Sequence, residues 1–508
     1  MNGIAGSRRA VFLFTTFVKM TDNNFLVPAL IATLGLMPAR RVTAQAFTVL
    51  HTFTSASGSN ATNSDGANPS AGLMLSGETL YGTARYGGSS GWGTVFAINT
   101  DGSVFATAYS FTGGSDGANP TATLILSNGI LFGTASAGGS SGHGTVFAVN
   151  TNGSSFTNLH NFTAPVSDSF GLYTNSDGAY PLADLILSGN TLYGSANAGG
   201  HSGQGAIFAV NINGSGFATL HSFSSGSSAA YSSAGLILSG NTMYGANYGN
   251  LGNGTVFAVN TDGTGFTNYY AFTAGNVNGH GVLTNSDGAN PHAELILSGD
   301  TLYGTAEHGG SSGQGTVFAV STNGTGFTTL HSFAAGAYNS SGSYTNSDGA
   351  NPSAGLVLSG NSLYGTARAG GNSGNGTLFM LKTDGSGFTN LYHFTATPRY
   401  PNQTNNDGAN PSAGLILSGN SLYGTTSSGG GSGNGTTFKL SFIPQLTILP
   451  SGTNVILVWP TNVAGFDYSG FVLQSAPMVT GTFTNLSGAT SPYVTPVDSA
   501  QRFFRLSQ

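Results

Sequence analysis

Seven copies of one four-part pattern fill the chain between residues 47 and 440. The copy at 124–162 reads LILSNGILFGTASAGGSSGHGTVFAVNTNGSSFTNLHNF and contains four short apolar runs, each ended by turn residues. Asn128-Gly129 and Asn152-Gly153 lie between paired runs. Asn-Gly in this position predicts a tight hairpin, because both residues tolerate the positive φ angles of a type I′ turn. The pattern therefore predicts a four-stranded antiparallel unit.

Each strand type occurs seven times. The Tyr-Gly or Phe-Gly pair of the second strand recurs at spacings of 51, 61, 51, 59, 61 and 59 residues. However, a strand of the fourth type, FTVLHTF at 47–53, precedes the first complete unit, and the last unit, at 412–440, lacks its own fourth strand. We therefore expect strand 47–53 to pair with residues 435–440. This pairing closes the array into a ring and protects its edges.

The predicted fold is all-β: a seven-bladed β-propeller over residues 47–440, with four strands in each blade. If the first strand of each blade is innermost, two kinds of long loop share one face. One kind precedes the first strand and carries NSDGANP, and the other joins the second and third strands and carries AGGSSGxG. Tight turns form the opposite face. Ligand recognition is therefore expected on the face with the long loops.

Composition excludes several classes of function. From Phe47 onward there are 7 Lys and Arg against 17 Asp and Glu, with no basic stripe, so nucleic acid is not an expected partner. The chain has 0 Cys, which excludes disulfides and thiolate metal sites. No His pair with metal-ligand spacing, no P-loop and no nucleophile elbow is present. Neither a metal nor a cofactor is expected.

Residues 1–46 are typical of an export signal. Arg8 and Arg9 precede the apolar run VFLFTTFV, a second apolar run begins at Phe25, and Ala44-Gln45-Ala46 fits a cleavage site. The signal fits either the twin-arginine route or the Sec route, with Met20 as the start in the second case. An uncleaved membrane anchor is the alternative. The sequence thus predicts a protein that is secreted or displayed on the cell surface.

The repeat stops at Leu440. LTILPS, NVILVWP, GFVLQSAP, TFTNLS and RFFRLSQ indicate short strands, with Trp459 as a core residue. Residues 441–508 resemble a small immunoglobulin-like or fibronectin type III-like β-sandwich. We expect them to form a separate domain after a short linker near Ser441 to Pro444. The whole chain is expected to be a monomer.

The repeat resembles a known family. The pattern LYGTAxxGGxSGxGTVFAVNTDGxGFTxLHSF is similar to the GloVer tandem repeat of exported proteins from Verrucomicrobia and related bacteria, over about 47–440. The blade also resembles the NHL type of propeller. The family resemblance implies export or surface display, and it implies no enzyme activity and no catalytic residues. Copy four, from Tyr231 to Phe272, departs from the pattern because it lacks NSDGANP.

Two recurring polar elements favour structural roles. NSDGANP recurs around six aspartates, and Asn63, Asp65 and Asn68 offer the hard oxygens that calcium prefers. Asp and Asn also bond their own backbone in turns, and repetition in six copies favours this second interpretation. Histidines in the fourth strand share one repeat position with Tyr, which indicates packing: His51, His160, His221 and His331.

Exceptions to the repeat suggest a site. Just before the leucine of the first strand, most copies have Gly or Thr, but two have Asp184 and Glu294. Rare charges and aromatics gather on the same long-loop face and define a candidate ligand-binding set: Arg85, Trp92, Asp184, Glu294, Glu307, His308 and Arg368. Asp184 and Glu294 precede innermost strands two blades apart, so we expect them to face each other across water at the channel mouth. Drift of exposed loops is the alternative.

Three functions remain open. The first is a non-catalytic binding or surface-display module for a glycan or another extracellular polymer, since Trp, Tyr, Asn and Gln suit sugar faces and hydroxyls. The second is a polysaccharide lyase or glycoside hydrolase that uses Asp184, Glu294 or Glu307 for acid–base chemistry, with Arg85 or Arg368. The third is a structural scaffold without a small ligand. We expect a protein that is not an enzyme.

Overall fold

The computed structural model describes residues 43–58, 60–167, 172–224, 234–248, 253–277, 282–291, 293–398, 403–463, 466–468, 470–478, 480–497 and 502–507. Every regular element in these ranges is a β-strand, which confirms the predicted all-β class. No helix in the described part of the chain is long and apolar enough to cross a membrane. The predicted export signal lies outside the described residues, except for its last four, which belong to β1 (Thr43–Thr52).

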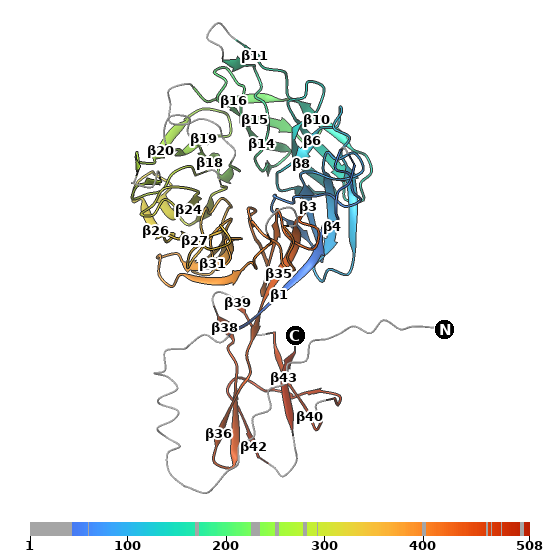
Figure 1. Cartoon of the computed structure of the whole chain (residues 1–508), viewed down its shortest axis with the longest axis vertical. Helices are drawn as coiled ribbons and strands as arrows, with labels where there is room; N and C mark the ends of the chain where they lie inside the picture. Colours follow the sequence, from blue (N-terminus) through green and yellow to red (C-terminus); the bar gives the residue numbers. More distant parts are fainter. Residues whose placement is uncertain are drawn as a thin grey trace, which may run out of the picture. The chain divides into compact units, whose positions relative to one another are not determined.

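The chain divides into two compact units. The larger comprises Thr43–Ile443 and Asn462–Ser469, and the smaller includes Pro444–Thr461 and Gly470–Gln508. Within the larger unit, Figure 1 shows the sheets arranged around a common centre. The candidate functional site lies in this unit.

The described residues of the larger unit form seven sheets on one plan, four antiparallel strands paired side by side. The first three sheets contain β2 (Met74–Ser76), β3 (Thr79–Ala84), β4 (Thr94–Asn99) and β5 (Phe105–Ser110); β7 (Ile125–Ser127), β8 (Ile130–Ala137), β9 (Thr145–Asn150) and β10 (Thr157–Asn161), with β6 (Ala118–Pro120) added against β8; and β13 (Ile186–Ser188), β14 (Thr191–Ala196), β15 (Ala206–Asn211) and β16 (Ala218–Ser222).

The other four sheets contain β17 (Ile237–Ser239), β18 (Thr242–Asn247), β19 (Thr255–Asn260) and β20 (Thr267–Ala271); β23 (Ile296–Ser298), β24 (Thr301–Ala306), β25 (Thr316–Ser321) and β26 (Thr328–Ser332); β29 (Val357–Ser359), β30 (Ser362–Ala367), β31 (Thr377–Lys382) and β32 (Thr389–His393); and β33 (Ile416–Ser418), β34 (Ser421–Thr426), β35 (Thr436–Pro444) and β1. Loops between sheets carry further two-stranded hairpins: β11 (Val166–Ser167) with β12 (Tyr173–Thr174), β21 (Asn276–Val277) with β22 (Leu283–Thr284), and β27 (Ala337–Tyr338) with β28 (Tyr344–Thr345).

The two Asn-Gly turns differ. Asn128 and Gly129 both have positive φ, 50° and 77°, as a type I′ hairpin requires. In the second turn only Gly153 has positive φ, and its N–H donates to Asn150 O at 2.8 Å. The prediction of a type I′ turn at Asn152-Gly153 is therefore wrong. The loop is one residue longer, with a normal turn followed by a glycine that restores the strand pairing.

β1 supplies the fourth strand of the last sheet, where it pairs with β35 as the sequence predicts. The N–H of Phe53 donates to Gly435 O at 3.2 Å. The Phe47 ring stacks on Tyr392 with a centroid separation of 4.0 Å and lies 5.3 Å from Phe438. Residues far apart in the chain thus share one sheet and one apolar cluster.

Neighbouring sheets are joined by a repeated hydrogen bond. The threonine of LYGTA donates its hydroxyl to an alanine carbonyl just before the first strand of the next sheet, as Thr305 does to Ala354 at 3.0 Å. The hydroxyl of Thr425 in the last sheet donates to Ala71 O ahead of the first sheet at 3.1 Å. The same bond is present at six junctions, with donors Thr83, Thr134, Ser195, Thr305, Thr366 and Thr425.

The glycine of LYGTA makes room for the core. A β-carbon on Gly304 would lie 2.6 Å from Phe318 Cζ and 2.7 Å from Leu295 Cδ2. Both of these side chains are buried, and a close-packed interior has no space for the added carbon. Close approach of the third-strand phenylalanine to the second-strand backbone therefore explains why Gly follows Tyr or Phe in every copy.

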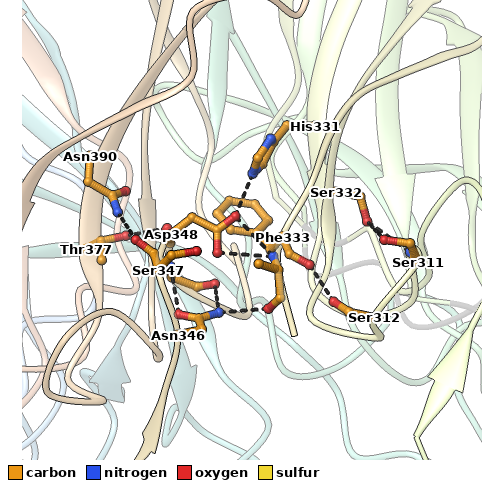
Figure 2. A network of polar contacts seen from close by, with 12 residues as sticks. Ser311, Ser312, His331, Ser332, Phe333, Asn346, Ser347, Asp348, Thr377 and Asn390 are labelled. Carbon is orange, nitrogen blue, oxygen red and sulfur yellow. Dashed lines mark hydrogen bonds and ion pairs between the residues drawn. The ribbon is translucent and has the colours of Figure 1, made fainter. Parts of the chain in front are cut away.

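Each NSDGANP turn is anchored to the end of the preceding fourth strand. Figure 2 shows the turn around Asp348, whose carboxylate accepts hydrogen bonds from His331 Nε2 and Ala334 N, each at 3.0 Å. The pairing of β25 with β26 is interrupted by a β-bulge, where the register shifts between Val317 and Phe318 of β25. Such bulges change the direction of the side chains that follow. Asn346 Oδ1 accepts from the N–H groups of Gly349 and Gly371 at 2.9 and 2.8 Å.

This contact pattern supports the turn interpretation of NSDGANP, because the Asp and Asn oxygens accept bonds from donors of the chain itself. The histidines of the fourth strand pack on Phe rings as predicted, but three of them also donate to the aspartate, with acceptors Asp65, Asp177 and Asp348. In three other copies a tyrosine hydroxyl donates instead, to Asp116, Asp287 and Asp407. Packing alone is therefore an incomplete account of this position.

We expect Asp65→Ala to lower the free energy of unfolding by about 2 kcal/mol at pH 7, since it removes a buried carboxylate that accepts hydrogen bonds from His51 and Thr54. Burial raises the pKa of Asp65, but hydrogen bonds from His51 and Thr54 outweigh burial and hold this pKa below its ordinary value. The ionised carboxylate is thus stabilised by folding, and its contribution is lost as the pH falls below about 4.

Urea denaturation at pH 7 and pH 3 measures this effect. The difference between wild type and Asp65→Ala is expected to shrink at the lower pH. Asp101→Ala, in an exposed turn, serves as the control and should cost much less. An equal loss of stability at both pH values would contradict a role for the charged carboxylate.

The smaller unit contains two three-stranded sheets. One has β36 (Thr447–Ser451), β37 (Asn454–Val458) and β42 (Tyr493–Pro496), and the other has β41 (Thr484–Asn485), β40 (Val472–Ala476) and β43 (Phe503–Ser507). Trp459 is buried beside Leu457 and Leu473, so the prediction that it is a core residue is confirmed.

The predicted linker near Ser441 to Pro444 is wrong, because these residues continue β35. A short hairpin of β38 (Asn462–Val463) and β39 (Phe466–Asp467) also belongs to the larger unit. The Phe466 ring stacks on Phe442 with centroids 4.2 Å apart and lies 5.5 Å from Tyr364. Burial of these three rings accounts for the association.

Candidate functional site

A cavity of about 720 Å³ lies among the segments that lead into the first strands of the seven sheets. Two repeat positions form most of its polar lining. The inner ring is the residue just before the first-strand leucine, and all seven of its members line the cavity: Gly72, Thr123, Asp184, Gly235, Glu294, Gly355 and Gly414. The rim is the residue that follows the second strand, and four of its members line the cavity: Arg85, Glu307, Arg368 and Ser427.

The inner ring is a continuous set of neighbours. A β-carbon on Gly72 would lie 2.7 Å from Thr123 Oγ1, and one on Gly355 would lie 3.2 Å from Glu294 O. A β-carbon on Gly235 would lie 3.3 Å from Asp184 Cβ and 3.2 Å from Glu294 Cβ. Glycine at 235 therefore gives the two acidic side chains room to converge.

Asp184 and Glu294 form the electrostatic centre of the cavity. Burial raises the pKa of Glu294 to about 8, and the charge of Asp184 adds to the shift. Burial also raises the pKa of Asp184, although its Oδ1 accepts a hydrogen bond from Thr123 N at 2.6 Å, which favours the charged form. Both side chains keep part of their surface open to the cavity. Near neutral pH the Glu294 carboxyl therefore keeps its proton and can donate a hydrogen bond.

Asp184 and Glu294 precede the first strands of the third and fifth sheets, which places them two sheets apart as predicted. They lie on either side of Gly235, because one intervening sheet presents only a glycine between them. Along the inner ring, only Gly235 lies between Asp184 and Glu294. A single ligand group can therefore contact both.

The rim combines cations with an acid. Arg368 Nη1 lies 3.8 Å from Glu307 Oε1, and the Arg368 side chain is 54% exposed. The Arg85 guanidinium lies 5.0 Å from the centre of the Tyr86 ring, and Tyr86 also lines the cavity. The structure thus brings together five residues of the predicted set: Arg85, Asp184, Glu294, Glu307 and Arg368.

Two residues of the predicted set lie away from the cavity lining. Trp92 is 43% exposed and packs beside Gly113, whose added β-carbon would lie 2.5 Å from Trp92 Cδ1. His308 pairs through its backbone with Ala289, and its ring Nδ1 lies 3.3 Å from Asn351 Nδ2. Both side chains serve the packing of the long loops.

Sequence reasoning missed a set of hydroxyls directly after the Asn-Pro of NSDGANP: Ser70, Thr121, Ser353 and Ser412. Among the described residues, the hydroxyls of Thr121 and Ser353 are buried without a hydrogen-bond partner. Their shared place in the repeat, one step ahead of the first-strand alanine, is the signal that points to them.

The described residues contain no group of three or more His, Cys, Asp or Glu that could hold a metal ion. The cavity offers two converging carboxyls, hydroxyls and two arginines. This set suits hydrogen bonding to a polar organic ligand.

The repeat identifies the family. The sequence pattern of the Gloeobacter/Verrucomicrobia repeat matches residues 40–250, 166–338, 246–397 and 334–475. The chain belongs to this family. The predicted resemblance is thereby confirmed for the Gloeobacter/Verrucomicrobia repeat, and the matches overlap across nearly all of the larger unit. None of the functionally curated proteins matches the chain.

Several solved structures are similar to this Gloeobacter/Verrucomicrobia repeat protein at low identity. The crystal structure of a nidogen/laminin complex has 12% identity and a TM-score of 0.33, and covers 65% of this chain and 88% of that one. A candidate 6-phosphogluconolactonase from Bacteroides fragilis NCTC 9343 has 15% identity and a TM-score of 0.41, with 84% and 97% covered. The gluconolactonase XC5397 from Xanthomonas campestris has 14% identity and a TM-score of 0.32, with 59% and 78% covered.

Proposed function

We propose that the larger unit is a seven-bladed β-propeller closed by β1. The repeated hydroxyl bond between sheets runs from Thr425 of the last sheet to Ala71 ahead of the first. The cavity lining, drawn from all seven sheets, agrees with closure around one axis. In such a fold the inner ring surrounds the channel, and the long loops form its mouth.

The proposed function is non-catalytic binding of a polyhydroxylated ligand, such as a glycan, in this cavity. The observation that carries the proposal is the composition of the cavity lining. It contains a carboxyl pair that can accept and donate hydrogen bonds, buried hydroxyls without hydrogen-bond partners, and arginines at the rim. The volume of about 720 Å³ falls within the range of small-molecule sites. Sugar hydroxyls both donate and accept hydrogen bonds, so they complement this mixed lining.

The test is a glycan screen with the full chain, followed by titration calorimetry on the best binder. The Asp184→Asn, Glu294→Gln double variant is expected to bind at least about tenfold more weakly, because losing charged hydrogen bonds costs about 1.5–3 kcal/mol each. The melting temperature should not fall. Asp101→Asn with Asp262→Asn, in exposed turns, is the matched control. Unchanged affinity in the cavity variant would remove the cavity as the site, and a screen without any binder would favour a structural scaffold.

A second candidate is a polysaccharide lyase or glycoside hydrolase. The raised pKa of Glu294, about 8, favours it, because a carboxyl that stays protonated at neutral pH can act as a general acid on a glycosidic bond. Sugar-release assays with the glycans identified in the screen distinguish the two functions. Turnover that Glu294→Gln abolishes, with binding retained, would establish the enzyme.

The remaining parts of the proposal concern location and assembly. The Gloeobacter/Verrucomicrobia repeat protein is proposed to be exported, as a secreted or cell-surface monomer, with an extracellular polymer as its partner. The smaller unit, with its two sheets and the core around Trp459, is proposed to be an immunoglobulin-like sandwich. Fractionation of cells that express the full chain tests the location, and a cytoplasmic product would contradict it.

A further inference from the structure

Arg85 is a cavity-lining cation without an anion. Among the described residues, no carboxylate lies within ion-pair distance of its guanidinium, and its Nε is buried without a hydrogen-bond partner. Its ring neighbour Tyr86, at 5.0 Å, contributes only a cation–π contact. Arg368 differs, because Glu307 lies 3.8 Å away and more than half of the side chain is exposed.

An arginine that is partly removed from water and lacks a counter-ion is costly to fold, and an anion that enters the cavity removes that cost. The guanidinium fork matches a carboxylate geometrically as well as in charge. Arg85 belongs to the first sheet and the acid pair to the third and fifth, so the cavity has a cationic wall and an acidic wall. The two walls therefore select different ends of a ligand.

We propose that the cavity binds a sugar carboxylate of the uronic acid class, with the carboxylate on Arg85 and the ring hydroxyls on Asp184, Glu294 and the hydroxyls of Thr121 and Ser353. This inference rests on the proposed function and narrows its ligand class. The same chemistry occurs in a free uronic acid and at the end of a uronate polymer. The acid pair accepts hydrogen bonds from the sugar hydroxyls. The unpartnered donors of Arg85, Thr121 and Ser353 donate hydrogen bonds to the ligand's oxygens, which include those of the carboxylate.

The test compares two sugars that differ only in the acidic group. D-galacturonate and D-galactose are titrated into the full chain by calorimetry at low and at high ionic strength. Galacturonate is expected to bind at least about tenfold tighter, with a preference that falls as salt rises. Galacturonate and galactose trisaccharides form the second arm, and tighter binding of the trisaccharide than of the single sugar identifies a polymer end as the source.

Three variants test which residue causes the preference for galacturonate over galactose. Arg85→Gln is expected to abolish the preference for galacturonate over galactose, and Arg85→Lys to retain part of it, since the charge remains but the fork is lost. Arg505→Gln, in the smaller unit, should leave it intact. Melting curves show whether each variant is folded.

Equal affinity of the wild type for the two sugars would overturn the inference and leave the proposed function standing. A preference that survives Arg85→Gln and disappears in Arg368→Gln would overturn it as well. Binding of neither sugar nor any glycan would overturn the proposed function together with the inference.

Discussion

Removal of residues 47–53 is expected to lower the free energy of unfolding of the larger unit by several kcal/mol. The deletion strips β35 of its partner strand and exposes the sheet edge. It also removes Phe53 and Leu50, which are buried in a cluster with Leu73 and Phe96 of the first sheet. Loss of one buried phenylalanine alone costs about 3–5 kcal/mol. The contacts of β1 therefore stabilise two sheets at once.

Urea denaturation of two shortened chains measures this effect. The chain that begins at Phe47 keeps residues 47–52 of β1 together with Phe53 and should match the full protein, whereas the chain that begins at Thr54 should unfold at much lower urea. Phe53→Ala separates the two causes, because it empties the apolar cluster and keeps the backbone pairing. Equal midpoints for the two shortened chains would contradict a structural role of β1.

Short-range signals predicted the strands and the missing fourth strand. Apolar runs between turn residues are local, and the orphan strand at 47–53 has only one free place in the array. The Asn152-Gly153 turn was mispredicted because the same dipeptide serves two hairpin geometries, and the choice depends on the length of the loop. The hairpin of β38 and β39 was also missed, since its association depends on contacts of Phe466 with the rings of Tyr364 and Phe442 in other strands.

The candidate site shows the same division. Deviations from the repeat pointed to Asp184 and Glu294, but their convergence depends on the side chain that Gly235 lacks. Trp92 and His308 also deviate from the repeat, yet they pack among loops and do not line the cavity. A sequence deviation alone cannot tell a side chain that points to the channel from one that points to its own loop. Thr121 and Ser353 were overlooked because Ser and Thr are common in every loop of this chain.

Glu294→Gln is expected to stabilise the larger unit at alkaline pH and to have little effect at pH 5. Burial raises the pKa of Glu294 from 4.5 to about 8, with the charge of Asp184 adding to the shift. Between these values the folded chain holds a proton that the unfolded chain has released, so stability falls as the pH rises. The neutral amide of glutamine carries no such dependence. The variant should therefore exceed the wild type by a few kcal/mol near pH 8.5.

Denaturation curves of both proteins between pH 5 and pH 8.5 check this expectation. Glu78→Gln, on an exposed turn, is the matched control and should follow the wild type throughout. Asp184→Asn should give a smaller gain, because it removes the repulsion but leaves Glu294 buried. Parallel curves for wild type and Glu294→Gln would mean that the carboxyl is hydrated and unperturbed. In that case Glu294 would be unable to donate a hydrogen bond to a ligand at neutral pH.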